Sequence, residues 1–385
     1  MTPNASHHSP STQILSLNAL RGIAALLVVV SHLPEQAGLH FGPVHEGSLG
    51  VMVFFTLSGF LMGYLYLGQP AGWREVARYS IARFSRIAPP YLMVVLASFF
   101  IYTLIDPKFP YAIGTHNFLR HFLFSGNVSV FWSIPPEVQF YALFIGFWWA
   151  LRRALTGRTL ALVVVMVLAV AAICIRDKVP GTFAISKLHF FLLGAMLGGL
   201  HPWLRTVPIS TRALTVLQVL LLGALGLFML EVIHLPEKYW HDLAPALIAG
   251  LVVFAFSHDR TPIDMAFMAK PFQWFGDWSF SIYLIHVPLI YLFVKAGWMQ
   301  EAGLLATLCV VAAIAGCAVF SIFVEKPACA ATKRGMNGWL KRLEHRLDAR
   351  GARHVARQGA RAEPAPEPAV TPRLVPEISS DRNTP

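Results

Sequence analysis

The stretch LNALRGIAALLVVVSHL, residues 17–33, decides the fold class of this chain. It is apolar enough for a bilayer, where a helix of roughly 20 residues crosses a hydrocarbon core about 30 Å thick. Arg21 lies near one end of the stretch and His32 near the other. Because polar side chains are costly in lipid, the stretch predicts a membrane helix with a polar cavity beside it.

The rest of the composition has the same character. Hydrophobic residues make up 56% and charged residues 13% of the 385 residues, and the mean hydropathy is +0.57. Ten apolar segments can be marked, at residues 15–33, 49–67, 88–105, 134–151, 159–175, 186–200, 213–231, 243–257, 275–294 and 303–323. The sequence therefore predicts an all-α, polytopic membrane protein with about ten transmembrane helices.

Three regions are expected along the chain: a cytoplasmic N-terminal segment at 1–14, a membrane domain at 15–328 and a basic, partly disordered cytoplasmic tail at 329–385. The N-terminal segment lacks the basic start of a signal peptide, so the first apolar run is expected to remain as a helix. In the tail, WLKRLEHRL at 339–347 is typical of a membrane-surface helix. The Pro, Ala and Glu content beyond about Ala362 predicts disorder.

The formal net charge of +11 is a signal of topology. Arginines and lysines concentrate in the loops that follow even-numbered apolar segments, whereas the other loops hold fewer and have acidic neighbours. The positive-inside rule then places the even loops and both termini in the cytoplasm. No nucleic-acid partner is expected, because the charge is explained by orientation.

The four cysteines are predicted to be small core residues. None of them has a C-x-x-C or zinc-like spacing, and no metal site is expected. They are Cys174, Cys309, Cys317 and Cys329.

Arg21 and His32 share one face of the first helix. They are 11 residues apart, which returns to within about 20° of the same face and separates them by about 16 Å along the axis. Two polar groups on one stripe indicate a polar cavity. The alternative is that Arg21 anchors the helix at the cytoplasmic interface and His32 caps it at the far interface.

The segment RYSIARFSRIAPPYL places Arg83 and Arg86 at i and i+3, next to each other on a short helical turn. Pro89 and Pro90 are then expected to start the third span, because proline suits the first turn of a helix. Paired guanidinium groups suit phosphate oxygens. Binding of lipid headgroups, or topology alone, is the alternative explanation.

Glu137 lies in FWSIPPEVQFYALF, one turn inside a span that is expected to enter from the extracytoplasmic side behind the anchor Trp132. Its expected depth matches that of His32. A carboxylate bonded to one imidazole nitrogen raises the basicity of the other, as a general base requires. The alternative is that Glu137 caps the amides of its own helix.

Three further residues are weighed. His286 is in the middle of the ninth segment, where a hydrogen bond across the bundle and a catalytic role are equally compatible with the sequence. His189 is expected at the outer interface. Ser58 precedes Gly59 but lacks the G-x-S-x-G elbow of a nucleophilic serine, so these small residues are interpreted as a close helix contact.

Several motifs together resemble one family. The segments LNALRGIAALLVVVSH, FFTLSGFL, RFSRIAPPYL, WSIPPEVQFYALF, SFSIYLIH and FVEKPA occur in the order found in the acyltransferase-3 family of integral membrane O-acyltransferases. The resemblance extends from about residue 15 to about 328. The positions that match the family's motifs are Arg21, His32, Arg83, Arg86, Trp132, Ser133 and Glu137. The chain departs from the family's pattern at Asn18, Ala19 and Val138, where acidic residues and glycine are frequent.

The resemblance implies an enzyme of the bacterial inner membrane without a permanently bound cofactor. Its donor would be cytoplasmic acyl-CoA, most often acetyl-CoA, and its acceptor a hydroxyl of a glycan or glycolipid such as O-antigen, exopolysaccharide or lipo-oligosaccharide. Membrane lipids would be its other partners.

Roles for the matching residues follow from the same resemblance. Arg21, Arg83 and Arg86 would hold the donor, and His32 supported by Glu137 would act on the acceptor hydroxyl. The candidates for stabilising the oxyanion are Ser133, Tyr283 and His286.

A transporter or a flippase of lipid-linked intermediates is the alternative, with Arg21, His32 and Glu137 as a proton relay. The sequence shows neither the internal repeats nor the paired broken helices typical of transporters.

Overall fold

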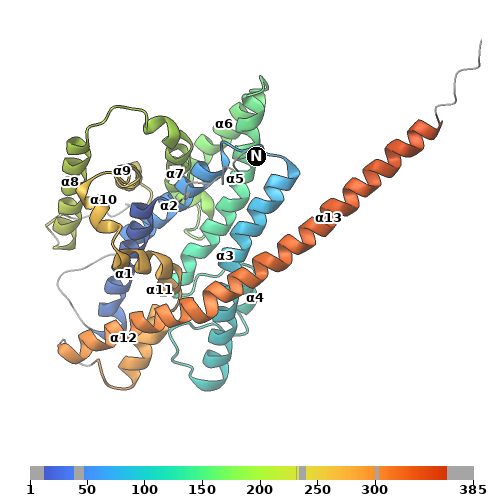
Figure 1. The fold of residues 1–385 in the computed structure, drawn as a ribbon. Coiled ribbons are helices and arrows are strands. Elements are labelled where there is room, and N and C mark those ends of the chain that lie inside the picture. Colours follow the sequence, from blue (N-terminus) through green and yellow to red (C-terminus); the bar gives the residue numbers. More distant parts are fainter. Residues whose placement is uncertain (1–12, 39–46, 231, 234–239, 300–302, 362–385) are drawn as a thin grey trace, which may run out of the picture. The chain divides into compact units, whose positions relative to one another are not determined.

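The computed structural model describes residues 13–38, 47–230, 232–233, 240–299 and 303–361 (Figure 1). All regular elements in these residues are helices, which confirms the all-α prediction. The chain divides into two compact units, Met1–Met336 and Asn337–Pro385. The first unit is a helical bundle that contains every predicted site residue.

Each of the ten predicted segments coincides with a helix of this bundle. They are α1 (Leu15–Ala37), α2 (Ser48–Tyr66), α3 (Trp73–Phe100), α5 (Ile134–Ala154), α6 (Leu160–Cys174), α7 (Ala184–Leu204), α8 (Thr211–Met229), α9 (Leu243–Ala255), α11 (Lys270–Lys295) and α12 (Leu304–Phe320). The short helices are α4 (Phe118–Phe122) and α10 (Pro262–Phe267), and the irregular turns are η1 (Ile101–Ile105), η2 (Ser129–Ser133), η3 (Arg176–Lys178) and η4 (Ser321–Glu325). Within the described residues, seven helices are long and apolar enough to cross a membrane, and α6 and α9 are shorter apolar helices. The protein is therefore a multi-pass membrane protein, while the number of ten spans and the orientation remain predictions.

Helices α2 and α7 approach each other through glycines. A Cβ atom on any of four glycines would lie 2.0 Å from a backbone oxygen of the opposite helix. The four are Gly59, Gly63, Gly194 and Gly198. Without side chains at these positions the two backbones can come into direct contact, as is common between membrane helices.

Helix α1 packs along α11. Asn18 donates to the Asp277 carboxylate at 3.2 Å, and Arg21 donates to Ser279 further along both helices. The first turn of α1 is held by Asp259, whose carboxylate accepts the backbone amides of Leu15 and Ser16 at 3.0 Å each. A carboxylate at a helix N-terminus is favourable because the free amides and the helix dipole are positive there.

The start predicted for the third span is wrong, because helix α3 begins earlier. It is continuous from Trp73 through Pro89 and Pro90, so these prolines do not start a helix. Pro90 has no amide proton to donate to the carbonyl of Arg86. The Cys329 thiol donates to that oxygen instead, at 3.5 Å. Arg83 and Arg86 consequently lie about 15–20 Å along the helix from its start, inside the bundle.

An ion pair ties the far end of α3 to α11. Lys295 and Tyr291 donate to the Asp106 carboxylate at 2.6 and 2.7 Å. The Lys295 ammonium and then the Tyr291 hydroxyl lower the pKa of Asp106 from 3.8 to about 2. The carboxylate is therefore ionised at any physiological pH.

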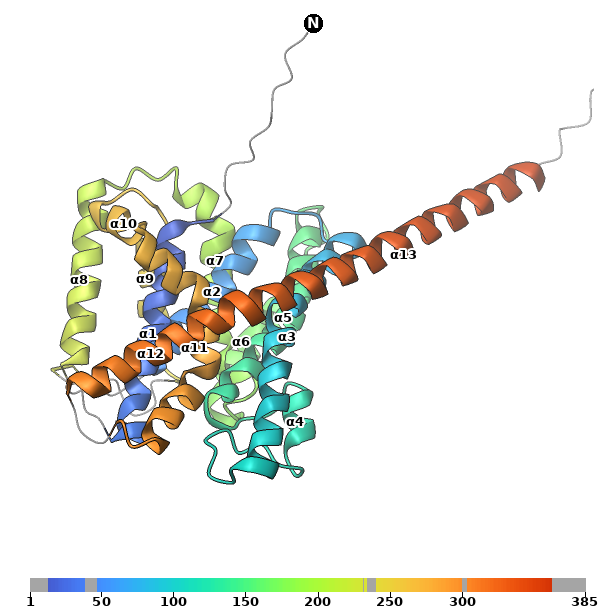
Figure 2. The same ribbon diagram turned by 60° about the horizontal axis from the view of Figure 1, so that its bottom comes forward.

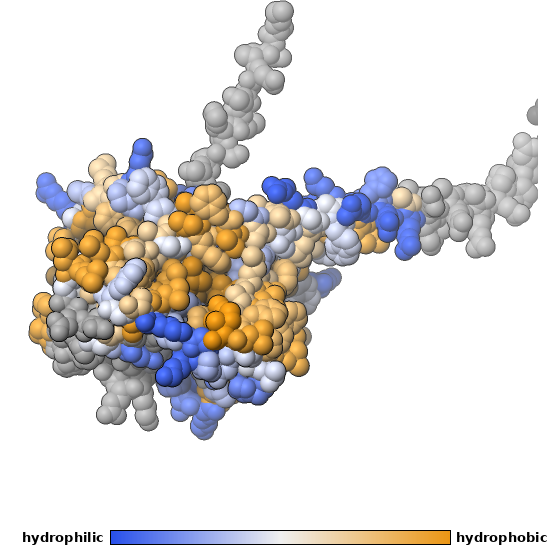
Figure 3. Space-filling view, turned by 90° about the horizontal axis from the view of Figure 1, so that it is seen from below, coloured by the Kyte–Doolittle hydropathy of each residue, from blue (hydrophilic) through white to orange (hydrophobic). Residues whose placement is uncertain are grey.

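The edge of the bundle is built for lipid. Helix α6 has no buried residue, and α8, which lies at the edge of the unit in both Figure 1 and Figure 2, buries only Leu214 and Gln218. Figure 3 shows broad hydrophobic areas on this unit. Cys309 and Cys317 are buried as predicted, whereas Cys174 is exposed on α6, where the prediction of a core position is wrong.

The last helix, α13 (Lys326–Arg361), contains the predicted surface segment 339–347. In that segment Trp339 and Leu347 are exposed. The disorder predicted beyond Ala362 and the residues 1–12 lie outside the described residues. The division into regions at 14/15 and 328/329 remains a prediction.

Candidate functional site

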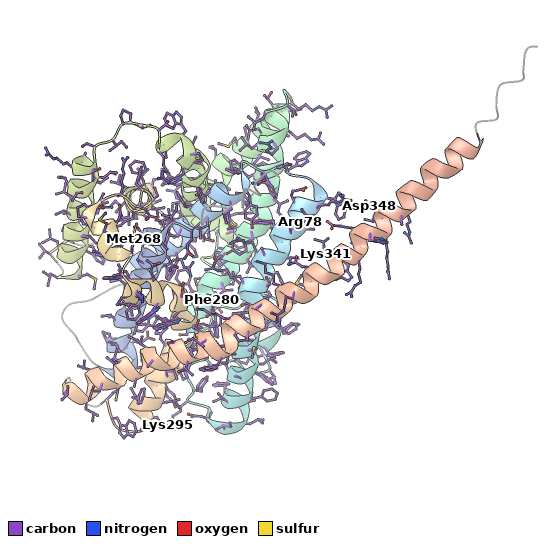
Figure 4. The ribbon with its side chains drawn as sticks, viewed as in Figure 1. Arg78, Met268, Phe280, Lys295, Lys341 and Asp348 are labelled. Carbon is purple, nitrogen blue, oxygen red and sulfur yellow. The ribbon has the colours of Figure 1, made fainter. Side chains whose placement is uncertain are left out.

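Five helices of the bundle enclose a polar pocket, which we call the arginine pocket. Its cavity of about 70 Å³ has room for several water molecules, since one needs about 10–15 Å³ on this measure. The polar side chains that line it are Arg21, Ser58, Arg83, Arg86, Ser133, Glu137, Tyr141, Ser279 and Tyr283. Figure 4 shows the lining residue Phe280 among the helices of the bundle.

The three arginines differ in how they are held. Arg21 donates from Nε and Nη2 to the Ser279 hydroxyl at 3.2 and 3.1 Å, and from Nη2 to the Gly276 carbonyl at 2.9 Å. Arg83 donates to the Tyr66 hydroxyl at 3.3 Å and lies over that ring. Within the described part of the chain, Arg86 makes no side-chain hydrogen bond or ion pair. The pocket therefore offers guanidinium donors to an anionic ligand.

Glu137 faces the same pocket from the buried start of α5. One of its oxygens, Oε1, accepts from the Ser58 hydroxyl at 2.9 Å and from the Tyr141 hydroxyl at 2.6 Å. The carboxylate therefore binds side chains, and the alternative that it caps its own helix does not hold. Trp132, expected to be an interface anchor, packs between Phe55 and Trp240.

The predicted pairing of His32 with Glu137 is wrong. No hydrogen bond joins them among the described residues: His32 Nδ1 lies 2.8 Å from the carbonyl oxygen of Val28, one turn back on α1. The physical reason is the starting level of α5. Its first residues are buried, so Glu137 reaches the level of Arg21, whereas His32 lies about 16 Å further along α1.

His32 is nevertheless oriented for proton transfer. Because a carbonyl oxygen only accepts, Nδ1 of His32 donates to it, and in the neutral ring Nε2 then has a lone pair. Its ring meets that of His286 edge to face, with centroids 5.1 Å apart. His286 has the same arrangement, with Nδ1 2.8 Å from the Ile282 carbonyl oxygen and Nε2 buried without a partner among the described residues. The structure thus brings together two imidazole rings one turn beyond Tyr283.

Ser133 and Tyr283 line the pocket but satisfy each other. The Tyr283 hydroxyl donates to the Val130 carbonyl at 2.8 Å, which leaves Ser133 to donate to the Tyr283 oxygen at 2.7 Å. With both protons committed, these hydroxyls are less suited to stabilise an oxyanion than the guanidinium groups of Arg21 and Arg86. His286 lacks a free donor for the same purpose, since its proton is on Nδ1.

The structure adds residues that the sequence interpretation missed. Ser58 was assigned to helix packing, but the close approach to α7 is at its neighbour Gly59, and Ser58 donates to Glu137. Glu325, in the π-helical turn η4, accepts from Ser321 at 3.0 Å and from Ser281. Ser58 lies in the FFTLSGFL motif and Glu325 in the FVEKPA motif, and these two motifs are the sequence signal that could have identified both residues. His189, expected at an interface, is only 4% exposed.

Comparison with known proteins identifies the family of this chain. A family model described as an acyltransferase domain matches residues 14–322. The chain belongs to the acyltransferase-3 family. The matched residues of this acyltransferase-3 protein include the whole arginine pocket and both imidazoles.

Several curated relatives are similar over most of this chain. Peptidoglycan O-acetyltransferase OatA of Listeria monocytogenes is 27% identical over 71% of this chain and 49% of its own length. Acyltransferase MdmB of Streptomyces mycarofaciens is 25% identical over 71% of this chain and 78% of its own. Exopolysaccharide production protein ExoZ of Rhizobium meliloti is 27% identical over 72% of this chain and 86% of its own. The chain thus spans about half the length of the Listeria protein. No solved structure matches it.

Proposed function

We propose that this acyltransferase-3 protein is a membrane-bound O-acyltransferase of the bacterial inner membrane. It moves an acyl group, acetyl in the first instance, from acyl-CoA to a hydroxyl of a cell-surface or exported glycan. Family membership supports acyl transfer. The glycan acceptor is supported by the names of two relatives, a peptidoglycan O-acetyltransferase and an exopolysaccharide production protein.

The observation that carries this proposal is the meeting of three arginines and a carboxylate in one pocket of an apolar bundle. Charged groups inside a bundle of membrane helices cost free energy and mark functional sites. Acyl-CoA carries phosphates, which guanidinium groups bind with charge-assisted and often bidentate hydrogen bonds. Arg86, which has no partner among the described residues, is the group best placed to bind a donor phosphate.

His32 supplies the base for the acceptor in this proposal. Its Nε2 lone pair takes the proton of the attacking hydroxyl, a role that contributes typically 10²–10⁴-fold. The carbonyl of Val28 keeps the ring in the required tautomer.

The test uses the purified full chain in lipid nanodiscs with labelled acetyl-CoA and glycan acceptors. Label on the glycan is the expected result. In R86A, loss of one charged hydrogen-bonding group, about 1.5–3 kcal/mol, should raise the KM for acetyl-CoA roughly 10- to 100-fold. The matched control R212A removes an exposed arginine outside the pocket and should leave KM unchanged.

Two results would contradict the proposal. One is an unchanged KM in R86A at full transfer activity, which would remove Arg86 from donor binding. The other is proton-coupled uptake of a substrate by vesicles that contain the protein, with no acyl transfer to any acceptor. That second result would favour a transporter.

A further inference from the structure

Ser58 presents a hydroxyl directly to a carboxylate inside the arginine pocket. Its Oγ donates to Glu137 Oε1 at 2.9 Å, and it is 8% exposed, on the pocket wall. A hydroxyl within hydrogen-bond reach of a base that is itself held by a third group is the arrangement of an activated nucleophile. The third group here is the Tyr141 hydroxyl, which donates to the same carboxylate oxygen at 2.6 Å.

We propose that Ser58 is the nucleophile that carries the acyl group covalently between donor and acceptor. Glu137 acts as its base, and Tyr141 is a positioning residue that holds the carboxylate. This inference rests on the proposed function and divides its reaction into two transfers. It replaces a direct attack of the glycan hydroxyl on the thioester.

In the first transfer, Ser58 Oγ attacks the carbonyl carbon of the thioester and its proton passes to Glu137. The carbon–sulfur bond breaks as the new carbon–oxygen bond is completed, and the departing CoA sulfur takes the proton from Glu137. In the second, the glycan hydroxyl attacks the serine ester and its proton passes to Glu137, which takes the place of His32 as the base for the acceptor in this scheme. The bond to Ser58 breaks, and Oγ recovers the proton from Glu137.

Other hydroxyls of the pocket lack this arrangement. Ser133 is bonded to Tyr283, and Ser279 donates to the Gly276 carbonyl at 2.8 Å while accepting from Arg21. Neither Ser133 nor Ser279 has a carboxylate partner among the described residues. Ser58 has one because Gly59, about 100° around α2, takes the contact with α7 and leaves Ser58 facing the pocket.

The experiment is a covalent trap on the full chain. The protein is incubated with labelled acetyl-CoA without acceptor, quenched in acid, and digested for mass spectrometry of the peptide with Ser58. One acetyl group is expected there in the wild-type protein and should disappear when a competent glycan is added. S58A should lack it and lose acyl transfer by at least about 10³-fold.

Matched variants exclude a structural effect. S133A removes a pocket serine without a carboxylate partner and should retain the acetyl group on Ser58. Y141F removes the hydroxyl that holds the Glu137 carboxylate, so the acetyl group should still form on Ser58 but more slowly. S58C should carry a thioester in its place, released by neutral hydroxylamine. Size-exclusion profiles and melting curves establish that each variant is folded. If S58A is not folded, S58C and the steady-state kinetics of the wild-type protein decide. Double-reciprocal plots of the initial rate against one substrate, at several concentrations of the other, should give parallel lines.

The outcomes separate this inference from the proposed function. Transfer at the wild-type rate in S58A overturns the covalent role and leaves the acyltransferase intact. Normal transfer by a wild-type protein that is never acetylated on Ser58 does the same, as do intersecting kinetic lines. Absence of any acetyl-CoA turnover in the wild-type protein, with every acceptor, overturns the proposed function itself.

Discussion

At the scale of single residues, backbone carbonyls orient histidine rings, a role that the sequence interpretation assigned to a carboxylate side chain. His32 is oriented by the carbonyl of Val28, four residues earlier on the same helix. His286 and His258 use the carbonyl at the same distance along the chain, at 2.8 and 3.0 Å. A helical histidine can therefore fix its own tautomer, and a carboxylate partner is unnecessary. This frees Glu137 for another role.

Replacement of His32 by alanine tests its role as base. We expect kcat for acyl transfer to fall by about 10²–10⁴-fold, because the proton of the acceptor hydroxyl would have no base. The adjacent Ser31 also bonds the Val28 carbonyl, at 2.8 Å, so S31A is the matched control and should stay near wild-type activity. Membrane insertion of both variants should be normal, and full activity of H32A would exclude the assignment.

At the scale of helices, the apolar runs predict the elements well because each run must be long enough to cross lipid. Their limits and tilts depend on distant partners. The thiol of Cys329 lies against the Arg86 carbonyl across 243 residues of sequence and supplies a donor where Pro90 has none. The starting level of α5, and with it the neighbours of Glu137, follows from tertiary packing in the same way. The arginine pocket could be predicted as a set of residues but not as a geometry.

The α2–α7 contact provides a prediction about stability. In G194A the new Cβ would lie 2.0 Å from the Thr56 carbonyl oxygen, and the helices must separate. We expect a loss of about 1–3 kcal/mol, typical of overpacking. In G146A, on α5, nothing lies within 4 Å, so stability should be unchanged or rise by up to about 1 kcal/mol. Melting curves in detergent compare the two, and equal melting temperatures would contradict the close contact.

At the scale of the whole molecule, the charges on the loops predict an orientation that no contact within the bundle reveals. The arginine pocket inside the bundle is polar and the edge is apolar, with α6 and α8 mostly exposed. A bundle of this kind is equally stable in either direction across a symmetric bilayer. Its orientation depends instead on the basic loops, which the sequence does reveal.

Cysteine labelling tests this orientation. In a cysteine-free variant, K108C lies in a loop predicted to be extracytoplasmic and R158C in one predicted to be cytoplasmic. A membrane-impermeant maleimide applied to intact cells should label K108C at once and R158C only after lysis. The opposite pattern would invert the topology and place the arginines on the wrong side for cytoplasmic acyl-CoA.

The pairing of α1 with α11 also has a consequence for biosynthesis. Arg21 emerges from the ribosome with the first span, but Ser279, which holds its guanidinium group, is 258 residues later. At about 5–20 residues per second, that interval lasts on the order of 10–50 s. For this time the first helix resides in the membrane with a charge that has no permanent partner. Insertion machinery that shelters nascent helices from lipid is therefore expected to retain α1 until the ninth predicted span has been made.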